Sequence, residues 1–271
     1  MRQPKWLRHF GLSESPFSKD LDDSDLWLPS SRKDVVDDLV DAIYERQHAV
    51  VVGEPGVGKT CTLRALRSRL PESDFRLTYC HNATLGRRDF YRQLCLTLQL
   101  PVKATAAGVF WALSNRVQEL SREKVHPVFL LDEAQLMRDE VLQHLHILSN
   151  YSWDQKPLLS IVLVGLPDLW RRLSLGVHRS LWSRIHCRVA LEQARPEDTV
   201  EYMEHRLSRV GGKASIFSSE ALAVLHEATA GQLRDIDRLA TACLRSASRR
   251  KIKVIDRELL QDAIDADVTL D

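Results

Sequence analysis

The stretch "VVGEPGVGKTCTLRALRSRL" (Val51–Leu70) decides the fold of this 271-residue chain. A short apolar run leads into a glycine-rich turn that matches GxxxxGK[ST], and a helical segment follows. The glycines let backbone N–H groups turn inward around phosphate oxygens, and the positive end of the helix points at the same anion. Strand, turn and helix in this order predict a phosphate-binding loop.

Every residue of this loop is a candidate nucleotide contact. We expect Lys59 to reach the β- and γ-phosphates and Thr60 to offer its hydroxyl to Mg²⁺. The expected cofactor-binding residues of the loop are Gly53, Glu54, Pro55, Gly56, Val57, Gly58, Lys59 and Thr60.

A second motif, "VFLLDEAQ" (Val128–Gln135), places two acids directly after an apolar strand. At a sheet edge, Asp132 would be a ligand of Mg²⁺, often through water. Glu133 would polarise the attacking water. The alternative is that both acids only cap the next helix. Paired with the phosphate loop, the adjacent acids predict a hydrolase.

The rest of the chain alternates short apolar strands with helices, which indicates an α/β fold with a mostly parallel sheet and helices on both faces. Continuous apolar runs such as "IVLV" (Ile161–Val164) are typical of strands buried on both faces. Beyond residue 193 the pattern changes to four helices. We expect an irregular lead-in over 1–32, an α/β core over 33–192 and a small all-helical lid over 193–271.

Composition excludes several classes of protein. Lys and Arg number 38 and Asp and Glu 37, so nucleic-acid binding would have to come from a local basic patch. No apolar run approaches the roughly 18–20 residues that span a bilayer, and the N-terminus lacks an apolar signal core. We expect a cytoplasmic protein without a membrane part. The five cysteines form no CxxC pair, which favours reduced, buried thiols.

The phosphate loop, "LLDE" (Leu130–Glu133), the next strand and the helical tail together resemble the AAA+ ATPases. The resemblance implies ATP and Mg²⁺ as cofactors and roles for two arginines. Arg184 in "LWSRIHCRV" best matches the finger that enters a neighbouring subunit's site, with Arg179 and Arg188 as competitors. Arg234 in "GQLRDIDRL" matches a sensor that touches the nucleotide of its own subunit. The alternative for each is an ordinary surface arginine.

The chain departs from the AAA+ pattern at Leu166, where related sequences often have Gln or Asn. Leucine cannot orient a water or contact a γ-phosphate by hydrogen bonding. We expect slow hydrolysis, or a polar residue nearby that performs the task. Slow turnover suits an assembly switch better than a motor.

Three stretches extend the resemblance over nearly the whole chain and narrow it to the ExeA-like AAA+ group. They are "FGLSESPFSKDLDDSDLWLPSSR" (Phe10–Arg32), "LSNYSWDQKPLLSIVLVGLPDLWRRL" (Leu148–Leu173) and "RIHCRVALEQARPEDTVEYMEHRL" (Arg184–Leu207). This group includes a secretion-associated ATPase and the transposon-encoded relatives of TnsC, TniB and IstB. Secretion-type members carry a membrane span and a cell-wall-binding extension, and these 271 residues show neither. We therefore expect a transposition regulator.

The resemblance implies an assembly cycle. Family members form homo-oligomeric rings or helical filaments on duplex DNA with ATP, recruit or activate a transposase, and disassemble on hydrolysis. We expect an ATPase that is slow and modulated by DNA. The alternatives are an ExeA-type secretion or envelope-assembly ATPase without a DNA role, and an ATP-gated scaffold with little hydrolysis.

Candidate DNA contacts follow the second strand. Arg87, Arg88 and Arg92 lie in "NATLGRRDFYRQ", and Lys103 comes after it. In related ATPases the equivalent region lines the central pore, and contacts to phosphates would make binding salt-sensitive. The alternative is that these are solvated helix charges. The basic run "RSASRRKIK" (Arg245–Lys253) is open to the same two interpretations.

Overall fold

The computed structural model describes residues 3–81, 84–101, 105–151 and 156–268. They fall into two compact units. The first, here the α/β unit, comprises Ser31–Glu54 and Thr62–Leu191. The second, here the helical unit, comprises Met1–Ser30, Pro55–Cys61 and Glu192–Asp271. The lead-in and most of the phosphate loop thus group with the C-terminal helices, while domain boundaries at residues 32 and 192 stay a prediction.

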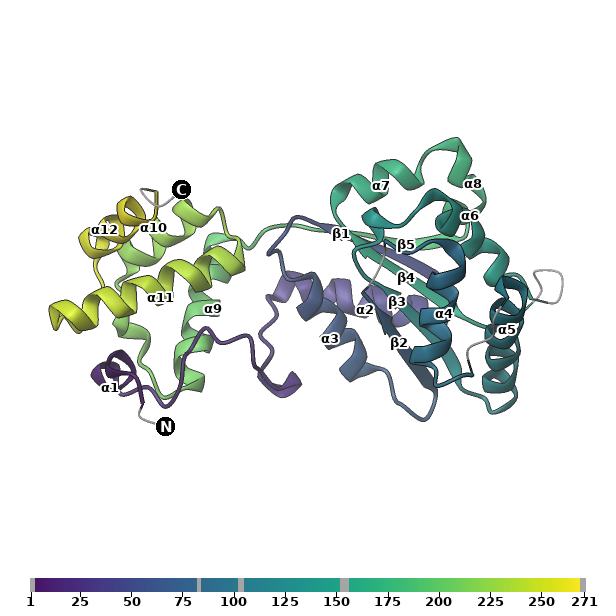
Figure 1. The fold of residues 1–271 in the computed structure, drawn as a ribbon. Coiled ribbons are helices and arrows are strands. Elements are labelled where there is room, and N and C mark those ends of the chain that lie inside the picture. Colours follow the sequence, from purple (N-terminus) through teal and green to yellow (C-terminus); the bar gives the residue numbers. More distant parts are fainter. Residues whose placement is uncertain (1–2, 82–83, 102–104, 152–155, 269–271) are drawn as a thin grey trace. The chain divides into compact units, whose positions relative to one another are not determined.

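The α/β unit contains a five-stranded sheet in the order β2-β3-β4-β1-β5, and every neighbouring pair is parallel (Figure 1). The strands are β1 (His48–Gly53), β2 (Phe75–Cys80), β3 (His126–Leu131), β4 (Ser160–Gly165) and β5 (Ile185–Leu191). The predicted parallel α/β sheet is confirmed.

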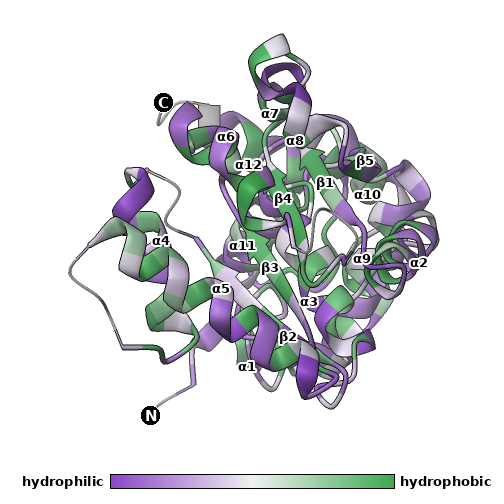
Figure 2. Cartoon of the chain, turned by 90° about the vertical axis from the view of Figure 1, so that its right-hand side faces the viewer, coloured by the Kyte–Doolittle hydropathy of each residue, from purple (hydrophilic) through white to green (hydrophobic). Residues whose placement is uncertain are grey.

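Helices flank this sheet. They are α2 (Ser30–Tyr44), α3 (Lys59–Arg69), α4 (Arg87–Thr97), α5 (Ala106–Arg122), α6 (Asp139–Leu148), α7 (Pro167–Leu173) and α8 (Arg179–Trp182), with short 3₁₀ turns η2 (Ala134–Leu136) and η3 (Gly176–His178). The three central strands are buried at every residue, whereas the edge strands β2 and β5 also carry exposed ones. Figure 2 shows most of the length of these central strands as hydrophobic. Cover on both faces explains why their sequences are continuous apolar runs.

The helical unit contains the four predicted C-terminal helices and one that was not predicted. Its elements are α1 (Lys5–Phe10), η1 (Asp23–Asp25), α9 (Pro196–Arg209), η4 (Ala214–Ile216), α10 (Ser219–Thr229), α11 (Leu233–Arg250) and α12 (Arg257–Val268). The lead-in was expected to be irregular, and α1 corrects this. Six residues are too few to show a helical period, but Leu7 is buried and Gly11 ends the helix at φ 71°. No helix among the described residues is both long and apolar enough to cross a membrane.

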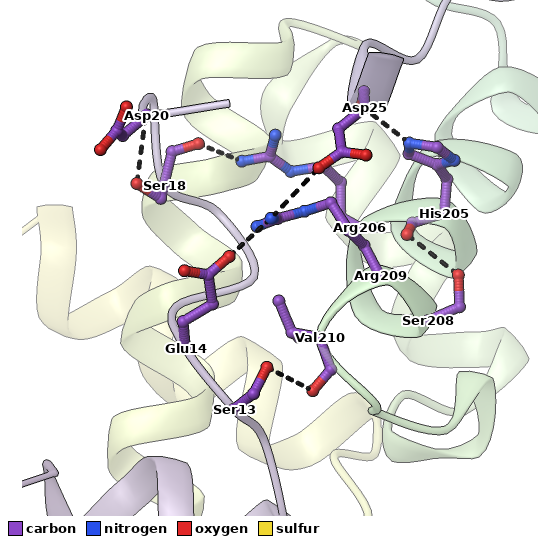
Figure 3. A network of polar contacts seen from close by, with 10 residues as sticks. All are labelled: Ser13, Glu14, Ser18, Asp20, Asp25, His205, Arg206, Ser208, Arg209 and Val210. Carbon is purple, nitrogen blue, oxygen red and sulfur yellow. Dashed lines mark hydrogen bonds and ion pairs between the residues drawn. The ribbon is translucent and has the colours of Figure 1, made fainter. Parts of the chain in front are cut away.

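The N-terminal segment is held on α9 by two arginines (Figure 3). Arg209 pairs with Glu14 at 2.6 Å. Arg206, only 3% exposed, donates to the carbonyl of Ser18 at 2.6 Å. Its guanidinium lies 5.9 Å from the ring of Phe17, which is itself buried. Buried guanidinium groups need such partners, so these contacts fix the lead-in to the helical unit.

Candidate active site

The carboxyl ends of parallel strands share one edge of a sheet, and this edge collects the predicted chemistry. β1 ends at Gly53, and β4 lies between β1 and β3. Asp132 follows β3 and Leu166 follows β4. The phosphate loop, the acidic pair and the departure at Leu166 therefore leave the same edge, where open α/β sheets bind their ligands.

The phosphate loop has the backbone that its sequence predicts. Gly56 and Gly58 have φ of 81° and 97°, in the left-handed region that glycine adopts without steric cost. Lys59 is the first residue of α3. Within the helical unit, a Cβ atom on Gly56 would lie 3.2 Å from the Cβ of Arg234. The predicted sensor thus lies beside this part of the loop, and its role stays a prediction.

Asp132 is 8% exposed, and hydrogen bonds hold both of its oxygens. Its Oδ1 accepts from the backbone N–H of Glu133 at 2.9 Å, and its Oδ2 accepts from the hydroxyl of Tyr79 at 2.7 Å. Burial, and then the bond to Asp132, raise the pKa of Tyr79 far above its usual value, so the hydroxyl keeps its proton and donates. Sequence reasoning missed Tyr79, because the sequences of β2 and β3 do not show that these two strands pair.

Glu133 is exposed and has a left-handed backbone, with φ 53°. This conformation is uncommon for a residue with a side chain and is held here by the Asp132 contact. Its Oε2 accepts from the amide of Gln135 at 2.7 Å, and the same amide accepts from the N–H of Leu166 at 3.2 Å. A polar side chain thus occupies the neighbourhood of Leu166. Gln135 was not singled out in the sequence, and its place in "DEAQ" was the only signal.

These residues suit a magnesium-bound nucleotide. The described part of the chain has no cluster of three or more Cys, His, Asp or Glu that could hold a metal alone. Mg²⁺ usually takes some of its ligands from phosphate oxygens, and Asp132 and the exposed Thr60 stay the predicted protein ligands. The glycines of the loop leave room for a phosphate chain close to the backbone.

The three arginines considered for the finger differ in their contacts. Arg188 stacks on the ring of Trp182, 3.8 Å from its centroid, and donates to two carbonyls of its own segment. Arg184 is half-buried and donates to the carbonyl of Ser180 at 3.2 Å. Arg179 is exposed at the start of α8. The choice of Arg184 stays a prediction.

The candidate DNA contacts are only partly brought together. Arg87 and Arg88 are exposed at the start of α4, while Arg92 is half-buried and lies 3.8 Å from an aspartate one turn earlier. Lys103 lies outside the described residues. Arg138, which sequence reasoning missed, has its guanidinium beside Gly86 at the same end of α4. About fifty positions separate it from Arg87, so only the tertiary structure could reveal the proximity.

Comparisons with known proteins agree with this architecture. Residues 41–173 match the family model described as AAA domain. General secretion pathway protein A of Aeromonas hydrophila is 31% identical over 248 residues, which cover 90% of this chain and 45% of that protein. Cdc6p from Pyrobaculum aerophilum superposes with a TM-score of 0.69 at 16% identity, over 92% of this chain and 69% of that one. Drosophila ORC bound to DNA gives 0.67 at 18% identity, over 97% and 65%.

These matches agree on the fold. It is the P-loop AAA+ fold, with a parallel sheet followed by a helical part, as the sequence predicted. The chain spans less than half the length of its curated relative from Aeromonas hydrophila.

Proposed function

We propose that this chain is an AAA+ ATPase that assembles on duplex DNA and regulates transposition. One observation carries the ATPase part: buried Asp132 and exposed Glu133 follow β3 at the sheet edge where β1 enters the phosphate loop. Hydrolysis needs both a ligand for a cation, here Asp132, and a base that can accept a proton, here Glu133. A loop that only bound phosphate would not need the second acid.

Bound Mg²⁺–ATP supplies a phosphoanhydride bond open to in-line attack and a cation that neutralises phosphate charge. The chain's own residues do the rest. Lys59 Nζ donates to phosphate oxygens, and a carboxylate oxygen of Asp132 holds the ion directly or through water. A carboxylate oxygen of Glu133 accepts a proton from the attacking water. Arg234 contacts the nucleotide in its own subunit.

Arg184 completes the site of a neighbouring subunit in a homo-oligomer, either a ring or a filament. A positive charge supplied in this way stabilises the charge that develops on the transferred phosphoryl group. It also makes assembly depend on bound nucleotide and lets hydrolysis drive disassembly.

The DNA part rests on Arg87, Arg88 and Arg138, three exposed arginines at the N-terminal end of α4. Two acids lie at this end: Asp89 in the first turn of α4, and Glu140, whose Oε1 is 3.4 Å from the backbone nitrogen of Arg87. A structural relative determined bound to DNA supports the same interpretation. Contacts of this kind go to phosphates, so binding would weaken steeply with salt. The transposase partner is proposed from the ExeA-like resemblance.

A secretion or envelope-assembly ATPase is the second candidate. The relative from Aeromonas hydrophila carries a secretion-pathway name, and it favours this function as much as the resemblance favours transposition. Both candidates share the ATP chemistry and differ in their partner.

Phosphate release with and without duplex DNA distinguishes the candidates. The transposition proposal expects DNA to change turnover, and electron microscopy with a non-hydrolysable ATP analogue to show ordered rings or filaments on DNA. If duplex DNA changes neither turnover nor oligomer size, that proposal is wrong. If the chain hydrolyses ATP without any DNA response, the secretion function is favoured.

A further inference from the structure

We propose that Gln135 is a positioning residue for ATP hydrolysis, holding the Glu133 carboxylate and tying it to the end of β4 through the backbone of Leu166. The inference rests on the proposed ATPase function. It identifies the polar residue that stands in for the side chain missing at Leu166.

The hydrogen bonds of Gln135 admit one orientation of its amide. Nε2 donates to Oε2 of Glu133 at 2.7 Å, and Oε1 accepts from the N–H of Leu166 at 3.2 Å. A carboxylate can only accept and a backbone N–H can only donate, so a flipped amide would lose both bonds. The bridge therefore has one direction of donation: the N–H of Leu166 donates to Gln135, and the amide of Gln135 donates to Glu133.

The absence of a side chain at Gly165 makes this bridge possible. A Cβ atom there would lie 2.5 Å from Oε1 of Gln135 and 3.3 Å from its backbone nitrogen. The first distance is shorter than any real carbon–oxygen contact, so a side chain would displace the amide. Gly165 has an ordinary extended backbone, so its requirement is for space: the same Cβ atom would also lie 3.0 Å from Cδ2 of Leu169.

The backbone of Gln135 is anchored as well. Arg172 on α7 donates through Nη1 to the carbonyl of Gln135 at 3.0 Å and through Nε to Asp139 at 3.0 Å. The bond to Arg172 is the largest effect on Asp139 and holds the pKa of that carboxyl below its usual range. Side chain and backbone of Gln135 are both fixed, as a residue that orients another must be.

This arrangement explains how the site works with leucine at position 166. Leu166 contributes only its backbone N–H. Gln135 accepts from this N–H and donates to Glu133, so it links the end of β4 to the glutamate. One carboxylate oxygen of Glu133 is held by the amide, which leaves the other to accept a proton from water. Loss of the amide would misplace the base without removing any contact to the nucleotide, and misplacement of about 1 Å costs up to about 10²-fold in rate.

The test compares Gln135→Ala with Gln135→Glu. Gln135→Ala should lower kcat by about 10- to 100-fold, with KM and the Kd of a fluorescent ADP analogue unchanged within about twofold. Hydrogen exchange at the Leu166 amide should accelerate. Gln135→Glu keeps an acceptor for that amide, so its exchange stays slow. A second carboxylate beside Glu133 disfavours the ionised base, and the acidic limb of the rate–pH profile should therefore move to higher pH.

Two further variants keep the test decisive. Gly165→Ala should reproduce the kcat loss of Gln135→Ala by displacing the amide, and the exposed Gln143→Ala on α6 should match the wild type. Wild-type kcat in both Gln135→Ala and Gly165→Ala, with Glu133→Gln inactive, overturns the inference and leaves the ATPase intact. A wild-type chain that releases no phosphate overturns the proposed function instead, and the exchange of the Leu166 amide still reports whether the bridge exists.

Discussion

The parallel strands of the central sheet all begin at one side, the amino edge, and end at the other, the carboxyl edge. Polar side chains lie at both edges, but their exposure differs. At the carboxyl edge, Glu133 is exposed in a left-handed conformation and Gly165 has no side chain. At the amino edge, His126 and Ser160 are buried against each other, with Nε2 and Oγ 2.9 Å apart. His48, also buried, accepts from the N–H of Ile161 at 3.2 Å.

The difference separates structural from chemical roles. Polar groups at the amino edge are enclosed and join β1, β3 and β4 to one another, so they stabilise the sheet. At the carboxyl edge, Glu133 instead has an exposed side chain and an uncommon backbone conformation, a combination that is frequent at functional sites. Arg184 immediately precedes β5 and thus belongs to the amino edge. In our proposal one edge serves the chain's own nucleotide, while the other presents a residue to a neighbour.

The largest expected effect tests that division. Arg184→Ala should lower turnover by about 10³-fold, because a finger arginine stabilises charge that develops only in the transition state. Mixing it with Lys59→Ala should restore part of the activity, since each variant supplies what the other lacks. The exposed Arg171→Ala serves as control. Wild-type turnover in Arg184→Ala would show that Arg184 is not the finger and that the amino edge has no role in hydrolysis.

Glu133→Gln tests the carboxyl edge. The amide keeps the shape of the side chain but cannot accept a proton as a carboxylate does, so phosphate release should fall by at least about 10²-fold. Binding of ATP, measured by calorimetry, should be unchanged. Unchanged phosphate release would mean that hydrolysis does not use this acid.

Lys59→Ala tests the loop that leaves the same edge. It removes charge-assisted hydrogen bonds of about 2–3 kcal/mol, which corresponds to roughly 30- to 150-fold weaker nucleotide binding. Titration with a fluorescent nucleotide measures the change, and unfolding in urea checks that the fold persists. Retained affinity would contradict the phosphate-loop assignment.

The smallest effect concerns the enclosed histidine at the amino edge. Burial, as the largest cause, lowers the pKa of His126 from 6.5 to about 4. Below pH 6.5 the unfolded chain takes up a proton that the folded chain refuses until about pH 4. Stability is therefore complete above that window and decreases as the pH falls through it, by about 2 kcal/mol between pH 7 and 5.

Urea unfolding at pH 7 and pH 5 measures this loss. His126→Gln, which can still hydrogen-bond Ser160, should lose about 2 kcal/mol less than the wild type over the same interval. The exposed His186→Gln should behave as the wild type does. Equal pH dependence in all three proteins would show that His126 is not held neutral by burial.

The sequence by itself determined the fold class and the candidate site residues. The phosphate loop and "DEAQ" are local patterns, and each can be recognised because its chemistry needs residues adjacent in the chain. Recognising the central strands likewise requires no long-range information, because a strand that is buried on both faces is a continuous apolar run in its own sequence. Among the described helices, the short α1, α7 and α8 were not predicted, because four to seven residues are too few to display a helical period.

Tertiary structure alone decided what surrounds those residues. Tyr79 reaches Asp132 across 53 positions, and Gln135 reaches Leu166 across 31. Such contacts depend on strand order and on the empty space at Gly165, and no local propensity encodes either. Leu166 appeared to be a defect in the sequence, whereas in the folded chain its backbone N–H anchors a bridge to Glu133. A backbone donor is the same for every residue except proline, so only the fold can show what it holds.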